Sequence, residues 1–212
     1  MNLVEVEVGY VKNLVNLNLR GCKKVEKLDI VGEMRSLKSL DLGGTGIEEF
    51  PSSSIRYLIN LEELFLTSCY NLTTVPCSIL ELKHLKHLDL LDCDNLVTFP
   101  TKCETRTTIL RYDSLFINLA YCRNLVEILE FPREIDGLDT RGCGSLRKMS
   151  SLSNIVEGRE TKMIPWMELH LCRKLCRNLA MDYLAKMKRE NTLPEDNSEV
   201  TTAVSVSFML AI

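Results

Sequence analysis

Cysteine is the residue type with the greatest chemical potential in this sequence, because a thiolate can act as a nucleophile or bind a metal ion. The 212 residues include nine cysteines, an odd number that argues against a framework of disulfides. Zinc sites draw on pairs of cysteines a few residues apart, whereas six of these thiols stand singly, each at the same position of an internal repeat. We therefore predict reduced, small core side chains and no metal ion. The six are Cys22, Cys69, Cys93, Cys122, Cys143 and Cys172.

The three histidines are the other candidates for acid–base chemistry. None of His84, His87 and His170 has a serine or cysteine at a spacing that suggests a nucleophile held beside a base. The sequence also lacks a GxxxxGK[ST] segment, the loop that cradles nucleotide phosphates. We expect a protein that binds or regulates, with no cofactor and no catalytic residues of its own.

Composition narrows the range of partners and compartments. With 45% hydrophobic residues, 26% charged residues and a net charge of −3, the chain lacks the basic excess that nucleic-acid binding favours. A membrane span needs about 20 consecutive apolar residues, and the run Phe208 to Ile212 is far shorter. Residues 1 to 10 lack the basic and then apolar order of a secretory signal. We expect a location in the cytoplasm or the nucleus.

The cysteines and histidines are positioned by an internal repeat that runs through most of the sequence. The spacing LxxLxLxxC begins at residues 14, 61 and 85, and a fourth copy from Leu37 to Thr45 has threonine at the cysteine position. This period of 23 or 24 residues is typical of leucine-rich repeats. Weaker copies follow around Ile117, Leu138 and Leu169, while Leu3 and Val6 match only the tail half of a repeat.

Each recurring position has a structural role. Alternation with period two places Leu17 and Leu19 inward on a short strand and their neighbours outward. We expect strands of successive repeats to stack in parallel and to depend on their neighbours for burial. The cysteine or threonine after the strand can pack inside, and Thr45 is expected to bond the backbone of the adjacent coil.

The segments that return from one strand to the next carry apolar residues three apart, which suits one or two turns of helix. Pro51, Pro76 and Pro100 each follow an apolar residue near such a segment, where proline removes no needed amide hydrogen bond. The apolar sets are Val31, Met34 and Leu37; Ile55, Leu58 and Leu61; and Ile79, Leu82 and Leu85.

We therefore predict an α/β fold, a leucine-rich repeat solenoid with a curved parallel sheet on the concave face, short helices or turns on the convex face, and a C-terminal helical cap. Residues 1–150 would hold the repeats, starting within a repeat. Residues 151–190 would hold a degenerate last repeat and a capping helix, and residues 191–212 a linker and an unpaired strand.

A membrane-binding or calmodulin-binding helix is the alternative to the cap. Its apolar face would be formed by Leu175, Leu179, Tyr183, Leu184 and Met187, beside core thiols at Cys172 and Cys176.

The outward strand positions are the candidate binding residues. We expect three columns on the concave face, with Phe65, Leu91 and Phe116 as candidate anchors, since binding energy concentrates in a few desolvated contacts. Aspartates at 41, 89 and 139 would favour a basic partner. The alternative is that all of these are solvated strand positions. The candidates are Asn18, Arg20, Asp41, Glu63, Phe65, His87, Asp89, Leu91, Phe116, Asn118, Asp139 and Arg141.

Two segments carry a family resemblance: Leu85–Pro100 (LKHLDLLDCDNLVTFP) and Leu37–Ser54 (LKSLDLGGTGIEEFPSSS). Both resemble the leucine-rich repeats of plant intracellular immune receptors that also carry a TIR domain and a nucleotide-binding domain. The shared features are cysteine or Gly-Thr where other repeats have asparagine, the Pro-Ser-Ser continuation and the Cys-x-Asn-Leu run. The resemblance covers roughly residues 1 to 180. It fails near residues 27–29, where the expected proline is missing, and at residues 52–54, which hold one serine more than usual.

The resemblance implies a regulatory and recognition role. In such receptors the repeats restrain the nucleotide-binding domain until a pathogen effector or a modified host protein engages them. The expected partners are such proteins and the nucleotide-binding domain of the same or a related receptor. A substrate-recognition repeat subunit of a ubiquitin ligase is an alternative, although those repeats run nearer about 26 residues. An extracellular ectodomain would instead show a signal peptide and paired capping cysteines.

Overall fold

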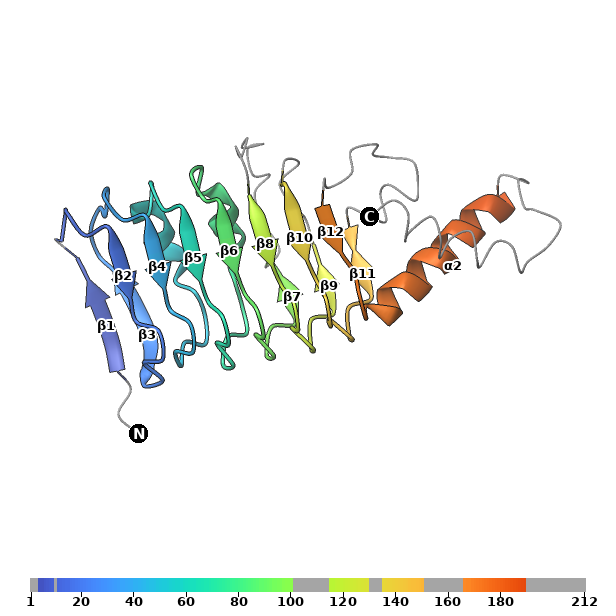
Figure 1. Cartoon of the computed structure of the whole chain (residues 1–212), viewed down its shortest axis with the longest axis horizontal. Helices are drawn as coiled ribbons and strands as arrows, with labels where there is room; N and C mark the ends of the chain where they lie inside the picture. Colours follow the sequence, from blue (N-terminus) through green and yellow to red (C-terminus); the bar gives the residue numbers. More distant parts are fainter. Residues whose placement is uncertain (1–3, 10, 101–114, 130–134, 151–165, 190–212) are drawn as a thin grey trace.

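The computed structural model describes residues 4–9, 11–100, 115–129, 135–150 and 166–189. Its largest element is a seven-stranded parallel sheet in which neighbouring strands follow one another in chain order (Figure 1). One strand comes from each repeat, as the sequence pattern predicts. The strands are β2 (Asn16–Asn18), β4 (Ser39–Asp41), β5 (Glu63–Phe65), β6 (His87–Asp89), β8 (Phe116–Asn118), β10 (Gly137–Asp139) and β12 (Trp166–Glu168).

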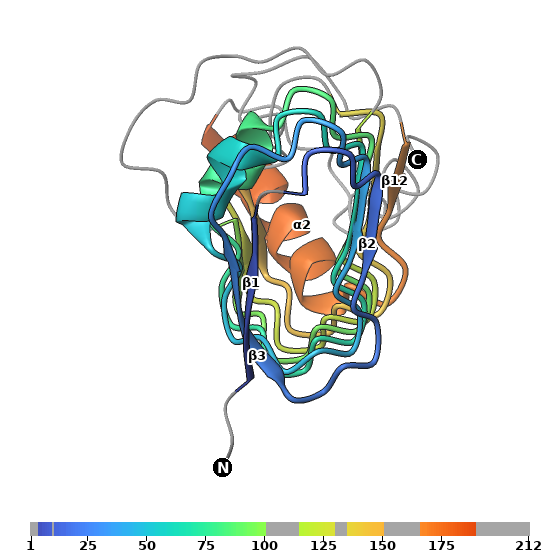
Figure 2. The ribbon, with the colours of Figure 1, turned by 90° about the vertical axis from the view of Figure 1, so that its left-hand side faces the viewer.

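Two smaller parallel sheets lie on the opposite side of the coils. One pairs β1 (Val4–Val8) with β3 (Val25–Ile30), and the other holds β7 (Thr98–Phe99), β9 (Glu127–Ile128) and β11 (Lys148–Met149). Viewed from the N-terminal end, β1 and β3 lie across the coil from β2 and β12, with the successive coils superposed (Figure 2). The core therefore runs along the inside of a stack of similar coils.

The inward leucines form that core. Leu40, Leu64 and Leu88 are partners in register on adjacent strands, and all three are fully buried. Leu17 and Leu19 point the same way but are only half-buried. The reason is that β2 is the edge strand, and no strand of the described chain pairs with its outer side.

The returning segments contain short 3₁₀ helices. η1 (Ser52–Tyr57) and η2 (Cys77–Glu81) each begin after a proline, Pro51 or Pro76, that serves as the N-cap. The expected helix at Val31–Leu37 is absent: the segment holds only a turn, in which the Leu37 N–H donates to the Met34 carbonyl at 3.1 Å, and Val31 is exposed. The physical reason is that, without a proline ahead of it, the backbone stays extended through β3 as far as Ile30.

The sequence departs from the family pattern near residues 27–29 and at residues 52–54, and one hydrogen bond connects these two regions. The buried hydroxyl oxygen of Ser54 accepts a hydrogen bond from the backbone N–H of Ile30 at 3.0 Å. Ile30 ends the lengthened strand that replaces the missing proline, and Ser54 belongs to the three-serine run of the next coil. The extra serine thus satisfies an amide that would otherwise be buried without a partner.

The cysteine position forms a ladder of hydrogen bonds. Each buried thiol donates to a backbone carbonyl of the preceding coil at 2.9 to 3.1 Å; the thiols are those of Cys69, Cys93, Cys122, Cys143 and Cys172. Burial raises the pKa of Cys122 to about 12 and that of Cys172 to about 11. These thiols are therefore protonated donors at neutral pH and poor nucleophiles.

The structure corrects four expectations about Thr45 and about cysteines outside this ladder. The Thr45 hydroxyl donates to the Leu42 carbonyl of its own coil at 2.7 Å and not to the backbone of the adjacent coil. Cys22 is exposed because it belongs to the same coil as the edge strand β2, whose outer side is covered by no strand of the described chain. Cys176 is exposed on a helix instead of buried in the junction. Cys77 is disulfide-bonded, so not every cysteine is reduced.

The helix α2 (Arg173–Arg189) follows the last strand directly. Leu175 and Leu179 on its first turns are buried in the core, while Tyr183 and Leu184 are half-buried. The side-chain amide of Asn178 donates to the carbonyl of Arg147 in the last coil at 2.9 Å. The first half of the helix therefore packs on the end of the stack. The side chain of Met187 and the strand predicted within residues 191–212 lie outside the described residues.

Candidate functional site: the outer face of the seven-stranded sheet

The outward-facing residues of the seven-stranded sheet form what we call the front face. Strand pairing places the same repeat position side by side on every strand, so the outward residues form columns across the strands. The first column is Asn16, Ser39, Glu63, His87, Phe116, Gly137 and Trp166. The second column is Asn18, Asp41, Phe65, Asp89, Asn118, Asp139 and Glu168.

The candidate residues differ in accessibility. Asn18, Arg20, Glu63 and Arg141 are exposed, whereas Asp139 is buried, at 3% exposure. The remaining candidates are half-buried, which leaves part of each side chain open to a partner; they are Asp41, Phe65, His87, Asp89, Leu91, Phe116 and Asn118.

An aromatic stripe crosses the front face, formed by Phe65, His87, Phe116 and Trp166. The ring of His87 lies 5.6 Å from that of Phe65 and 5.6 Å from that of Phe116, with only 8° between the His87 and Phe116 planes. The Phe116 and Trp166 rings are 5.3 Å apart. Aromatic pairs at these separations attract each other beyond the effect of burial alone. The stripe is therefore a preorganised surface that spans β5 to β12.

Gly137 makes the last contact of the stripe possible. It occupies the first column on β10, between the strands that carry Phe116 and Trp166. A Cβ atom at this position would lie 2.6 Å from Phe116 Cδ2 and 3.2 Å from Trp166 Cε3. The two rings meet over β10 because glycine leaves that space empty.

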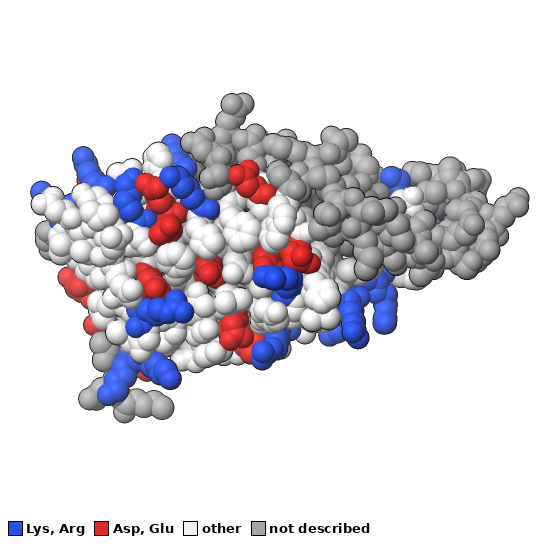
Figure 3. Space-filling model, viewed as in Figure 1, with Lys and Arg blue, Asp and Glu red and all other residues white. Residues whose placement is uncertain are grey.

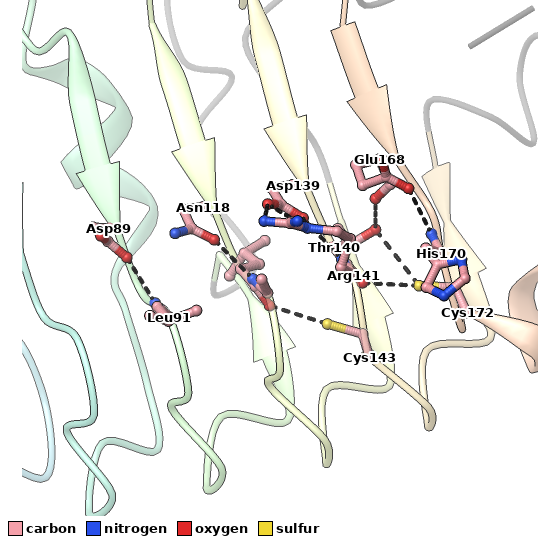
Figure 4. A network of polar contacts seen from close by, with 12 residues as sticks. Asp89, Leu91, Asn118, Asp139, Thr140, Arg141, Cys143, Glu168, His170 and Cys172 are labelled. Atoms are coloured by element: carbon pink, nitrogen blue, oxygen red, sulfur yellow. Dashed lines mark hydrogen bonds and ion pairs between the residues drawn. The ribbon is translucent and has the colours of Figure 1, made fainter.

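Polar residues of the second column bind their own backbone. Each side-chain oxygen accepts the N–H of the residue two positions later at 2.9 to 3.0 Å, a local contact that Asn and Asp favour at turns. Glu168 makes the same contact with the N–H of His170 at 3.0 Å (Figure 4). The Asn and Asp residues concerned are Asn18, Asp41, Asp89, Asn118 and Asp139. This column therefore shapes the turns that end the strands, a role that the sequence analysis missed.

The expected row of free aspartates is only partly available. Arg141 Nη2 lies 2.7 Å from an oxygen of Asp139, and Arg20 Nη1 lies 3.7 Å from one of Asp41. Both arginines belong to a third column, which lies two residues after the second on each coil and also holds Leu91. Asp41 and Asp139 thus have basic neighbours from this third column. Asp89 has no arginine or lysine partner among the described residues, and its nearest basic group is His87 Nε2 at 3.8 Å.

The start of the strands carries a separate charge cluster. Glu62 accepts contacts from both Lys38 and Lys86 at 2.6 Å, which lowers its pKa to about 2. In the space-filling view, charged side chains of both signs lie in small groups among uncharged atoms of the front face (Figure 3). Charged groups of both signs are thus interspersed with uncharged areas across this face.

Three residues of this site escaped the sequence analysis: Gly137, Trp166 and Glu168. The signal for the last two was present, because Met167, Leu169 and Cys172 repeat the inward positions of the pattern. Extending the alternation back from Leu169 makes Glu168 and Trp166 outward-facing. Gly137 carries no comparable signal, because its role depends on the size of two rings on neighbouring strands.

Within the described part of the chain, no group of three or more histidine, cysteine, aspartate or glutamate residues has the arrangement of a metal site. A search of the same residues finds no helix with the length and apolarity that crossing a bilayer requires.

The class of protein follows from these features. Parallel strands arranged in chain order, one from each leucine-bearing repeat, and an outward face of aligned side chains are those of a leucine-rich repeat region. No family model matches the chain. Individual relatives do match, and they identify the group of proteins more closely.

The chain is 32% identical to TMV resistance protein N of Nicotiana glutinosa over 166 residues, which cover 70% of this chain and 14% of that protein. It is 30% identical over 145 residues to the disease resistance protein RPS4B of Arabidopsis thaliana, covering 68% of this chain and 11% of the relative. It is 36% identical over 114 residues to the Arabidopsis disease resistance protein RPP4, covering 53% and 9%. The chain thus spans about a tenth of the length of these relatives. It belongs with the leucine-rich repeat region of plant TIR/nucleotide-binding/leucine-rich-repeat disease resistance receptors.

Proposed function

We propose that this chain is the protein-interaction and autoregulatory module of a plant intracellular innate immune receptor. Its coils form a leucine-rich repeat solenoid, with α2 as the cap that covers the last coil. The module recognises a pathogen effector or a host protein and restrains the nucleotide-binding domain of the same or a related receptor. It works by binding alone, without catalytic residues, in the cytoplasm or the nucleus.

The aromatic stripe is the observation that carries this proposal. Interfaces draw most of their binding energy from a few large side chains, among which aromatic residues are enriched. The stripe holds three such side chains, Phe65, Phe116 and Trp166, with the His87 ring between the two phenylalanines, and Trp166 at its end is 45% exposed. A surface that is already ordered loses little conformational entropy when a partner binds.

The cap is supported by the packing of α2. Strands stacked in a row leave an open apolar end, and a repeat protein needs a terminal element to cover it. Leu175 and Leu179 are buried against the last coil, and Asn178 bonds its backbone. These contacts favour a cap over a helix that binds a membrane or calmodulin.

Co-expression in leaf tissue tests the proposed function. The chain is expressed with a related disease resistance receptor from which the repeats have been deleted, and cell death is scored. We expect the wild-type chain to restrain cell death and Phe65→Ala, Asp89→Ala and Phe116→Ala to weaken that restraint, because each removes a side chain from the front face.

The matched control is Arg56→Ala, which changes an exposed residue of η1 on the return side of the coil. It should behave like the wild type, with equal protein amounts checked by immunoblotting. Equal restraint by the wild type and all four variants would contradict a functional front face.

A further inference from the structure

The front face carries more negative than positive charge, and that excess lies beside the aromatic stripe. Five carboxylates stand in its first two columns, at Glu63, Asp41, Asp89, Asp139 and Glu168. The two guanidinium groups of the third column, those of Arg20 and Arg141, are already paired with Asp41 and Asp139.

The three remaining carboxylates all flank the stripe. Glu63 is the register partner of His87, and Asp89 is the register partner of Phe65. Glu168 lies two residues after Trp166 on β12. Among the described residues, neither Glu63 nor Glu168 has a basic group within ion-pair distance. Arg141, which is paired with Asp139, is close enough for its charge to act on Glu168 as well, but it makes no ion pair with that carboxylate. A cationic side chain of a partner would thus meet carboxylates that lack an ion-pair partner among the described residues, beside aromatic rings.

Trp166 is the most exposed ring of the stripe, and Glu168, two residues later on the same strand, is half-buried. Residues two apart on a strand point to the same side and are separated by about 6.6 Å along it. The Phe116 ring contacts Trp166 at a tilt of 37° from the direction of β8, and the tryptophan remains 45% exposed. Tryptophan is the aromatic residue that attracts cations most strongly, and arginine stacks on it more often than lysine does. A guanidinium group on Trp166 would lie within reach of the Glu168 carboxylate.

We propose that the front face binds an arginine-bearing segment of its protein partner, with the guanidinium group lying between the Trp166 ring and the Glu168 carboxylate. This inference rests on the proposed function, since it names the chemistry of the partner at the same face. The lysines at the start of the strands do not oppose it, because Lys38 and Lys86 share the carboxylate of Glu62. Charge complementarity of this kind selects partners as well as strengthening binding.

Trp166 is the single tryptophan of the chain, so its fluorescence reports on this end of the stripe directly. The full chain is titrated with acetyl-Gly-Leu-Arg-Leu-Gly-amide and with matched peptides that carry citrulline or glutamate instead of arginine. Citrulline keeps the shape of arginine and removes its charge. We expect a saturable change in emission, with the arginine peptide binding about five-fold more tightly than the citrulline peptide and the glutamate peptide binding most weakly.

Two variants localise the effect. Glu168→Gln should reduce the arginine-to-citrulline ratio from about five to about two, because the Trp166 ring still attracts the cation. Glu81→Gln changes an exposed residue of η2 on the return side and should leave the ratio unchanged. If circular dichroism shows that Glu168→Gln is unfolded, the wild-type ratio is measured again at high salt, where screening should lower it in the same way.

An arginine peptide that binds no more tightly than the citrulline peptide, or a glutamate peptide that binds best, would overturn the inference. The same conclusion follows if no peptide changes the emission of Trp166. The proposed function is judged separately: if front-face variants alter cell death while the peptide ratio is one, only the cationic chemistry of the partner is wrong.

Discussion

Replacing Leu88 by alanine is expected to lower the free energy of unfolding by about 2 to 5 kcal/mol, the range for removing a fully buried leucine. Leu88 lies at the middle of β6 and is fully buried between Leu64 and Ile117, its register partners on both sides. Urea denaturation followed by circular dichroism measures the change.

Leu17→Ala provides the matched control, because Leu17 holds the same position of the repeat on the edge strand β2 and is only half-buried. It should cost less than half as much, since less apolar surface returns to water. Equal losses for the two variants would contradict a core whose burial depends on neighbouring coils.

Gly137→Ala is expected to break the aromatic stripe. The added Cβ would lie 2.6 Å from Phe116 Cδ2, so the Phe116 and Trp166 rings must separate. Overpacking of this kind costs about 1 to 3 kcal/mol. The emission spectrum of Trp166 should change as the ring loses its contact with Phe116, and the same spectra report the unfolding midpoint.

Gly144→Ala is the corresponding control, because a Cβ at that position meets nothing within 4 Å. It should change neither the emission of Trp166 nor the unfolding free energy by more than about 0.5 kcal/mol. If Gly137→Ala leaves the emission unchanged, the described contact over β10 is absent in solution.

The positions of the strands could be predicted from the sequence because one rule governs all of them. Inward leucines recur at a fixed distance before the cysteine. The spacing of residues such as Leu64, Leu88 and Cys93 therefore indicates where each strand lies and which of its side chains point inward. The coil that separates Leu88 from Ile117 is longer than its neighbours, and the two residues are still register partners. Extra residues in a return segment do not shift the pairing, because the buried pattern fixes it again on the next strand.

Features that depend on contacts between coils could not be predicted in the same way. The lengthened strand β3 and the Ser54 hydroxyl compensate for each other across 24 residues of sequence. The second-column aspartates seemed free to meet a partner, but their oxygens bind backbone N–H groups, and two of them also have arginine neighbours. Such pairings follow from which residues the stacking brings together, and a single repeat does not contain that information.

The ladder of thiols illustrates why cysteine suits its position in the repeat. Its side chain is small, and in the buried state it donates to a backbone carbonyl of the preceding coil, so the thiol itself is not left without a partner. Because burial keeps these pKa values high, the ladder serves packing and not reactivity. The cysteines that first suggested chemistry therefore support the face that carries the candidate binding residues.

The central claim is that successive coils of the chain stack on one another, so that their strands form a single sheet with one column of inward apolar residues at its centre. Nuclear Overhauser contacts between labelled methyl groups test it most directly, using Leu40, Leu64, Leu88, Ile117 and Leu138 of the central inward column. Adjacent strands lie about 4.8 Å apart, so we expect strong contacts between each residue and its neighbour in the next coil, and weak or absent contacts between residues two coils apart. Missing contacts between neighbours, or strong contacts that skip a coil, would contradict the stack and the binding face built on it.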